Sequence, residues 1–164
     1  MSKKLETELY KAAALTFEEL SFLLPTPEID EQQWNAQAEA AVSVDFEGPF
    51  SGKLLLKVYG GLLPVIAANM LGEEDVPSKG QQYDALGEIA NVICGHMLPG
   101  IAGSKDIFHV SPPRRAETMD LPPIIVNDSV GQVCDWPNLV LRLERTFLRG
   151  RVNLQREGTT AVMN

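Results

Sequence analysis

Residues 36–59, AQAEAAVSVDFEGPFSGKLLLKVY, decide the fold class of this 164-residue chain. In the first half of this stretch, Val42 and Val44 alternate with polar neighbours, a period of two that is typical of a half-buried strand. Residues 48–52 supply the glycine, proline and serine of a turn, and residues 53–59 follow as a second, apolar-rich strand. The stretch therefore predicts a β-hairpin.

Helical periodicity flanks this hairpin on both sides. The predicted helices cover residues 4–24, ended by Pro25 and Pro27, residues 62–71, closed by Gly72, and residues 82–102, with Pro99 and Gly100 marking the end. Further strands are predicted at residues 107–110, 124–126 and 130–134, and a closing hairpin pairs 139–144 with 150–156 around 147–149. Residues 111–123 contain four prolines and predict an irregular crossing that cannot pair as a central strand. Because the strands fall in pairs instead of alternating with helices, we expect an α+β fold, a mostly antiparallel sheet with two long helices packed on one face.

The length fits one domain, since compact domains cluster near ~100 to 150 residues. We expect that domain to span residues 1–158 and a disordered tail to occupy residues 159–164. With 45% hydrophobic and 22% charged residues the composition is that of a globular protein, and no apolar run approaches the ~20 residues of a membrane span. The first residues turn acidic and helical before any apolar stretch of signal-peptide type. The sequence therefore predicts a cytoplasmic protein that does not associate with a membrane.

Charge and cysteine content disfavour several classes of function. The formal net charge of −8 argues against nucleic acid as a partner, because such binding needs Lys and Arg to neutralise phosphates. Cys94 and Cys134 form no C-x-x-C pair and have no His-x-x-x-His spacing nearby, so we interpret both as reduced packing residues and not as zinc ligands. The sequence has no phosphate-binding loop, Ser-His-Asp grouping or acidic metal cluster, which disfavours an independent nucleotide enzyme.

The helix predicted at residues 82–102 carries the clearest functional pattern. At 100° per residue, one narrow stripe is apolar and must be buried: Leu86, Ile89, Ala90, Ile93 and Met97. The opposite face carries a polar line with spacings of four, three and four residues: Asp84, Glu88, Asn91 and Gly95. His96 lies about 100° away from this line, so we interpret it as surface or edge packing.

Two features of the polar line exceed what an ordinary solvent-facing helix requires. Gly87 and Gly95 stand on or beside it, although each glycine costs a helix interior about 1 kcal/mol relative to alanine. A missing side chain allows another backbone to approach closely, as at a docking surface. Asn91 is a weak helix former in mid-helix, where Lys or Gln would serve solubility better. From these residues alone, a functional surface and a plain polar face remain equally open.

The segment Asp84-Ala-Leu-Gly-Glu88-Ile-Ala-Asn91-Val-Ile-Cys-Gly95 resembles the signature helix of the CheC/CheX chemotaxis phosphatases. In that helix an acidic or Ser residue is followed four residues later by Glu and three later by Asn. The preceding Met70-Leu-Gly-Glu-Glu74 and the chain length are most similar to CheX, so the resemblance spans roughly residues 5–155. It implies a pseudo-symmetric CheC/CheX-like fold with a related helix in each half.

The first predicted helix contains a match to this signature. Residues 15–22 align with residues 84–91, and Glu19 falls on Glu88, but Phe22 stands where the asparagine would be. As a diverged copy, the first helix would lack the amide, leaving one active face per chain as in CheX. Chance similarity between two amphipathic helices is the favoured account of so short a match.

The resemblance implies a phosphatase for phosphorylated CheY-like response-regulator receivers, in chemotaxis or related two-component signalling. Asn91 would orient the attacking water, and Glu88 would anchor the receiver's active-site lysine. Asp84, Gly87 and Gly95 would serve docking to the partner. The receiver supplies the Mg²⁺ beside its aspartyl phosphate, so this chain would bind no cofactor or metal of its own. CheX proteins are dimers, so a homodimer through sheet edges or hairpin strands is expected.

Two alternatives remain open at this point. A module of the same fold could bind a receiver or a flagellar-switch partner without catalysis, because one fold serves many functions. An unrelated α+β scaffold with a decorated helix is the other alternative. The presence of both Glu88 and Asn91 favours the enzyme.

Overall fold

The computed structural model describes residues 2–26, 38–72, 76–103, 105–116, 138–143 and 146–156. Its helices are α1 (Ser2–Ser21), α3 (Leu62–Leu71) and α4 (Lys79–Ile101). Its strands are β1 (Pro25–Thr26), β2 (Ala38–Glu47), β3 (Phe50–Tyr59), β4 (His109–Val110), β5 (Arg114–Ala116), β6 (Asn138–Leu143) and β7 (Thr146–Arg156). The strands predicted at 124–126 and 130–134, Cys134 and the tail predicted at 159–164 lie outside the described residues.

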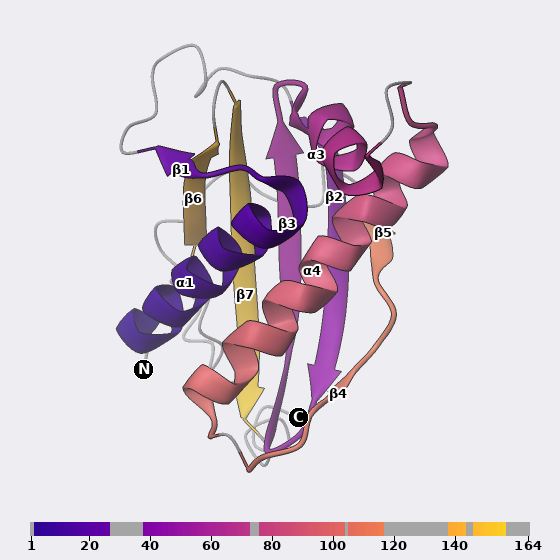
Figure 1. The fold of residues 1–164 in the computed structure, drawn as a ribbon. Helices are drawn as coiled ribbons and strands as arrows, with labels where there is room; N and C mark the ends of the chain where they lie inside the picture. The colour runs from indigo at the N-terminus through magenta and orange to yellow at the C-terminus, as the bar shows by residue number, and fades with distance from the viewer. Residues whose placement is uncertain are drawn as a thin grey trace.

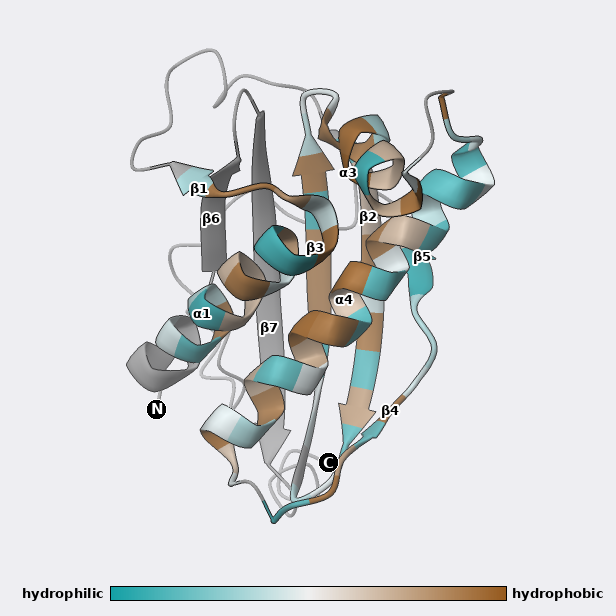
Figure 2. Cartoon of the chain, viewed as in Figure 1, coloured by the Kyte–Doolittle hydropathy of each residue, from teal (hydrophilic) through white to brown (hydrophobic). Residues whose placement is uncertain are grey.

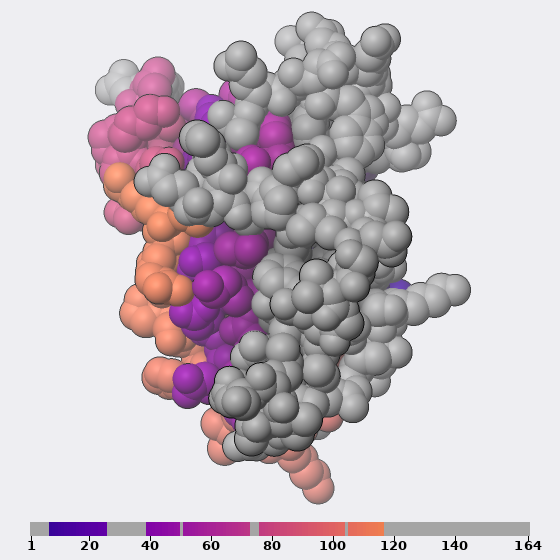
Figure 3. Space-filling view, turned by 180° about the vertical axis from the view of Figure 1, so that it is seen from behind, coloured from indigo at the N-terminus to yellow at the C-terminus, as the bar shows by residue number. Residues whose placement is uncertain are grey.

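The described strands form one sheet in the order β1-β6-β7-β3-β2-β4, with β5 also pairing with β2, and every pairing is antiparallel. All three described helices lie on the same face of this sheet, with α1 and α4 crossing it side by side (Figure 1). From behind, residues 105–116 follow the edge of β2 (Figure 3). The predicted fold class, a mostly antiparallel α+β sheet with two long helices on one face, is confirmed.

The first hairpin has a tighter turn than the sequence indicates. Only Gly48 and Pro49 separate β2 from β3, and Gly52, predicted as part of the turn, pairs with Phe46. A Cβ on Gly48 would lie 2.7 Å from a ring carbon of Phe108 and 2.9 Å from the carbonyl oxygen of Ile107. The turn needs glycine because the segment before β4 packs directly on its backbone.

The closing hairpin is present, but the predicted turn at residues 147–149 is wrong. These residues lie inside β7, where Leu148 pairs with Leu141 of β6 and with Val58 of β3. The strands approach their turn at the pair Leu143 and Thr146. Hydrogen bonding to a neighbour on each side keeps residues 147–149 extended, and the local sequence carries no sign of those neighbours.

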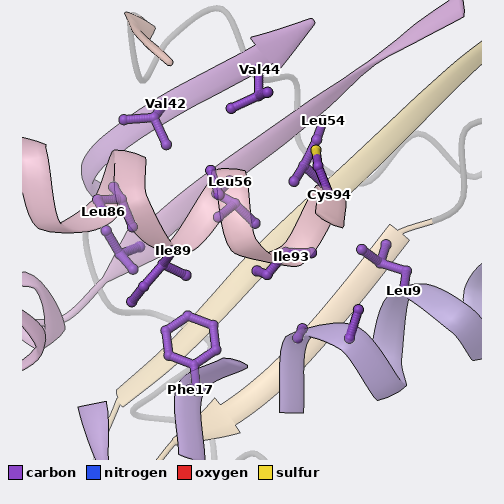
Figure 4. Close-up of a cluster of buried hydrophobic side chains, with 14 of the residues drawn as sticks. Leu9, Phe17, Val42, Val44, Leu54, Leu56, Leu86, Ile89, Ile93 and Cys94 are labelled. Atoms are coloured by element: carbon purple, nitrogen blue, oxygen red, sulfur yellow. The ribbon is translucent and has the colours of Figure 1, made fainter. Parts of the chain in front are cut away.

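The hydrophobic core lies between the sheet and the helices. β2 and β3 contribute alternate residues that are each at most 2% exposed: Val42, Val44, Phe46, Leu54, Leu56 and Val58. α1 contributes Leu9, Ala12, Ala13 and Phe17, and α4 contributes Leu86, Ile89, Ala90, Ile93, Cys94 and Met97. Side chains from both helices and both strands meet in this layer (Figure 4). Apolar residues recur along α1, α4, β2 and β3 (Figure 2), and those of α1 and α4 that belong to the core are buried, so burial fixes which side of α4 points outward.

Both long helices differ from their predicted limits. α4 begins at Lys79, earlier than predicted, because Ser78 and Gln81 form a capping box in which the Ser78 side chain accepts from the Gln81 N–H and Gln81 Oε1 accepts from the Ser78 N–H. Pro99 does not end it, since the helix continues to Ile101. α1 ends at Ser21, before the predicted Leu24, because Phe22 adopts a left-handed φ of 60°.

Candidate functional site

The polar line predicted on α4 lies on the outward face of that helix. Asp84, Glu88 and Gly95 are exposed and Asn91 is half-buried, whereas the five residues of the predicted apolar stripe are completely buried. At 1.5 Å rise per residue, Glu88 and Asn91 are separated by about 4.5 Å along the helix axis. The predicted geometry, two polar side chains on neighbouring turns of an anchored helix, is therefore present.

α1 flanks the polar line on one side. The carboxylate of Glu19 approaches His96 Nε2 at 3.9 Å, and Glu8 packs against the backbone at Gly100. His96 itself is exposed, as expected for an edge residue. These contacts, added to the shared core, fix α4 against α1 from one side.

The segment leading into β5 flanks the same line on the other side, next to the N-terminal half of α4 (Figure 1). A Cβ on Gly87 would lie 2.8 Å from Cγ of Pro113, so the proline ring occupies the place of a side chain. The guanidinium carbon of Arg115 lies 4.2 Å from the ring centroid of Tyr83. Sequence patterns gave no sign of this flank, because each contact joins α4 to residues more than twenty positions later.

The two glycines of the predicted docking surface have different environments. Gly87 is buried, and the close approach that it permits is that of the Pro113 ring in the same chain. Gly95 is exposed, and a Cβ built there would have no described atom within 4 Å. A docking role for Gly87 can therefore only be indirect, through the segment that packs on it, whereas Gly95 leaves open space at the surface.

The amide of Asn91 has one unsatisfied group. Its Oδ1 is shielded from solvent and accepts no hydrogen bond from any described residue. A buried amide oxygen without a partner costs about 1–3 kcal/mol, and native proteins satisfy most such groups. A hydrogen bond donated to this oxygen would therefore be stabilising.

The aligned positions on α1 also face solvent. Leu15 is 41% and Phe22 is 71% exposed, and Glu19 is exposed next to them. The surface of α1 therefore presents a carboxylate but no amide at the aligned positions. The equivalence of the two helices stays a prediction.

Other candidate functional groups are few in the part of the chain that the structure describes. No group of three or more His, Cys, Asp or Glu side chains there is arranged to hold a metal ion. Cys94 is buried and free of any disulfide, and burial raises the pKa of its thiol to about 12, which suits the predicted packing role. None of the described helices has the length and apolar character needed to cross a bilayer.

Comparison with known protein families shows which family the chain belongs to. The family described as "Chemotaxis phosphatase CheX" matches residues 40–128, which is more than half of the chain. The chain belongs to the CheX family. The matched region includes most of β2 and all of β3, α3, α4, β4 and β5, and therefore the whole polar line of α4. A search of curated proteins by sequence found no significant match.

Solved structures share the CheX fold at low sequence identity. The chemotaxis protein CheX from Desulfovibrio desulfuricans is 12% identical with a TM-score of 0.68, over 92% of this chain and 99% of that one. The CheX–CheY–BeF3–Mg²⁺ complex from Borrelia burgdorferi matches at 12% identity and a TM-score of 0.63, over 92% and 97%. FliY from Thermotoga maritima matches at 17% identity and a TM-score of 0.55, over 94% and 87%. These likenesses establish the fold.

Proposed function

We propose that this chain is an aspartyl-phosphate phosphatase for a phosphorylated CheY-like receiver. Membership of the CheX family supports the activity, and the outward line of Glu88 and Asn91 on α4 supports its location. The observation that carries the proposal is the spacing of these two polar residues on the outward face of α4, with the predicted apolar stripe completely buried behind it. The Borrelia burgdorferi relative in complex with CheY supports this class of partner.

In this mechanism Asn91 positions the attacking water. Phosphoryl transfer passes through a loose, in-line transition state, so a phosphatase gains most from placing a water opposite the leaving aspartate. A carboxamide offers both a donor and an acceptor on a short side chain, which suits that task. The receiver carries the Mg²⁺ that neutralises the phosphoryl oxygens, and this chain adds no metal.

The amide of Asn91 must turn for this step. The terminal torsion of an asparagine is broad and roughly two-fold, so the oxygen and nitrogen exchange places at modest cost. The oxygen, which has no hydrogen-bond partner among the described residues, then accepts a hydrogen bond from the attacking water. Docking of the receiver favours the turned amide because it satisfies that oxygen.

Glu88 is the anchor for the receiver. Its carboxylate is exposed one turn before Asn91, within reach of the lysine that lies beside a receiver's aspartyl phosphate. A charge pair at this point fixes the register of the docked helix and excludes partners without a matching cation. Asp84 and Gly95 extend the contact along the same line.

A second candidate function is a module that binds the receiver without hydrolysing its phosphate. The shielded oxygen of Asn91 favours it, because a catalytic amide that stays in this conformation would not meet a water. The two candidate functions share Glu88 as the anchor. They differ only in whether the bound receiver loses its phosphate faster than the free receiver does.

The test is to mix the chain with a panel of phosphorylated CheY-like receivers and to follow the loss of phosphate. We expect at least one receiver to be dephosphorylated faster than by its own hydrolysis. Glu88→Ala should weaken binding of that receiver by about tenfold or more and slow hydrolysis at low concentration. His96→Ala, on the same helix but off the polar line, is the control and should match the wild type. Tight binding with no faster loss of phosphate would favour the binding module.

We also propose that the chain acts as a cytoplasmic homodimer, as the resemblance to CheX implies. The chain has a mass of 18.0 kDa, so sedimentation should give about twice that value. A monomeric mass at micromolar concentration would contradict the dimer and leave the phosphatase proposal intact.

A further inference from the structure

Two consecutive arginines on β5 face opposite sides of the sheet. Arg114 pairs with Ser43 of β2, and Arg115 pairs with Val42, whose side chain belongs to the core beneath the helices. Because side chains alternate along a strand, Arg115 lies on the helix side and Arg114 on the other. Arg114 is bound there to Asp45, with 2.7 Å between its guanidinium nitrogen and the carboxylate oxygen. The charge of Arg114 is thus already paired, at the back of the sheet.

Arg115 is exposed and is held in place by an aromatic ring. Its guanidinium carbon lies 4.2 Å from the ring centroid of Tyr83 on α4, a cation–π contact. It forms no ion pair with any described residue. Stacking on a ring leaves the edge of the guanidinium free, so its planar fork of N–H donors can still pair with a carboxylate. Arg115 is therefore a positioned cation with unused donors.

The close packing of Pro113 on Gly87 sets where this cation sits. The proline ring fills the space of the missing Cβ, so the backbone two residues before Arg115 is fixed against α4. On a helix, Gly87 lies about 40° from Asn91 around the axis, and it directly precedes Glu88. The arginine is consequently held at the flank of the polar line, beside its N-terminal half.

We propose that Arg115 is a specificity-determining contact that pairs with a carboxylate on the rim of the receiver's phosphorylation site. This inference rests on the proposed function. The described part of the polar line offers the partner only negative charge, Asp84 and Glu88, whereas a receiver's site gathers carboxylates and a phosphoryl group around one lysine. A cation at the flank supplies the complementary charge that two acidic surfaces lack. Arg115 acts in docking and takes no part in the hydrolysis step.

The experiment uses a receiver that the wild-type chain dephosphorylates. Kd is measured with its beryllofluoride-activated, Mg²⁺-bound form, and the steady-state constants are measured with its phosphorylated form. Arg115→Ala should raise Kd and KM by about 3- to 10-fold and leave kcat within about twofold. Arg115→Glu should raise Kd further, and the salt dependence of binding should be weaker in Arg115→Ala than in the wild type. Arg114→Ala removes the same charge from the neighbouring residue on the opposite side, and should bind like the wild type.

A second pair of variants separates positioning from charge. Tyr83→Leu removes the ring under the guanidinium and should reproduce part of the loss in Kd, whereas Tyr83→Phe keeps the ring face and should not. Combining Tyr83→Leu with Arg115→Ala should cost less than the sum of the single effects, because both remove one contact.

Several results would overturn this proposal. Equal Kd values for Arg115→Ala and Arg114→Ala would reject it while leaving the phosphatase intact. A fall in kcat with unchanged Kd would reject a docking role for Arg115 as well. If the wild-type chain binds none of the receivers and accelerates phosphate loss from none, the proposed function is wrong. The proposed contact of Arg115 is then rejected with it.

Discussion

At the scale of single residues, Gly87 and Gly95 of α4 have contrasting surroundings. Gly87 cannot carry a Cβ without displacing the ring of Pro113, whose Cγ would be 2.8 Å away. A Cβ on Gly95 would have no described atom within 4 Å, so no described neighbour requires glycine there. The fold thus requires glycine at position 87 but does not require it at position 95.

This contrast predicts opposite effects of alanine on stability. Gly95→Ala should raise the free energy of unfolding by about 0.4–1 kcal/mol, because alanine loses less backbone entropy in a helix. Gly87→Ala should lower it, since the Pro113 ring is held in its own chain and has no free end to rotate away. Urea unfolding of both variants measures the difference. A more stable Gly87→Ala would show that the Pro113 segment does not pack tightly on α4.

Gly95→Ala also tests docking separately from folding. If Gly95 lies at the contact with the receiver, the added methyl group should weaken binding of a beryllofluoride-activated receiver although the fold is more stable. Binding equal to that of the wild type would remove Gly95 from the docking surface.

At the scale of the secondary-structure element, the start of α4 depends on its capping box. Ser78 Oγ accepts from the Gln81 N–H at 3.2 Å, and Gln81 Oε1 accepts from the Ser78 N–H at 2.9 Å. Ser78→Ala removes one of these bonds and should destabilise the chain by about 1 kcal/mol. Ser78→Thr keeps the hydroxyl and is the matched control. Denaturation midpoints that are equal for the alanine and threonine variants would contradict a stabilising cap.

Sequence patterns located the elements better than their ends. The buried stripe of α4 was predictable because five apolar residues repeat at helical spacing, and Leu86 and Ile93 are indeed completely buried. Its first turn was missed because Ser78 and Lys79 lie in a segment rich in Gly, Ser and Pro, where composition suggests a connection. Its end was misplaced because Pro99 was interpreted as a terminator, whereas the helix continues through it to Ile101.

The candidate site also has a part that the sequence predicted and a part that it did not. The spacing of Glu88 and Asn91 is a local property, so the sequence predicted their common face. The flank made by Pro113 and Arg115 depends on pairing between β5 and β2, a contact across some seventy residues that no local period encodes. The shielding of the Asn91 amide oxygen from solvent is a tertiary property and was equally beyond prediction.

At the scale of the whole molecule, Cys94 reports on global unfolding. It is fully buried in the common core, and burial raises its thiol pKa from 9.0 to about 12. With the folded pKa above the unfolded one, this residue contributes stability that is complete below pH 9 and is lost as the pH rises toward 12. Cys94→Ala should therefore show a smaller loss of unfolding free energy between pH 9 and pH 10.5 than the wild type.

The same burial predicts slow reaction with thiol reagents. In a Cys134→Ser background at pH 8, Cys94 should be labelled only as fast as the chain unfolds, and urea should accelerate the labelling in step with the unfolding equilibrium. Rapid labelling of the native chain would contradict a closed core between α4 and the sheet.

The functional account as a whole depends on one amide. Asn91→Ala improves helix propensity and removes an acceptor that no described residue satisfies, so the variant should be at least as stable as the wild type. A loss of activity in this variant therefore cannot arise from unfolding. Asn91 can be tested by truncation with its fold intact.

The decisive measurement is the rate of phosphate loss from a phosphorylated receiver at saturating concentrations of wild-type and Asn91→Ala protein. The account predicts that the variant loses about 100-fold or more of the catalysed rate, because the water is no longer positioned. Its Kd for the beryllofluoride-activated receiver should stay within about twofold. Equal catalysed rates for the two proteins would contradict the account.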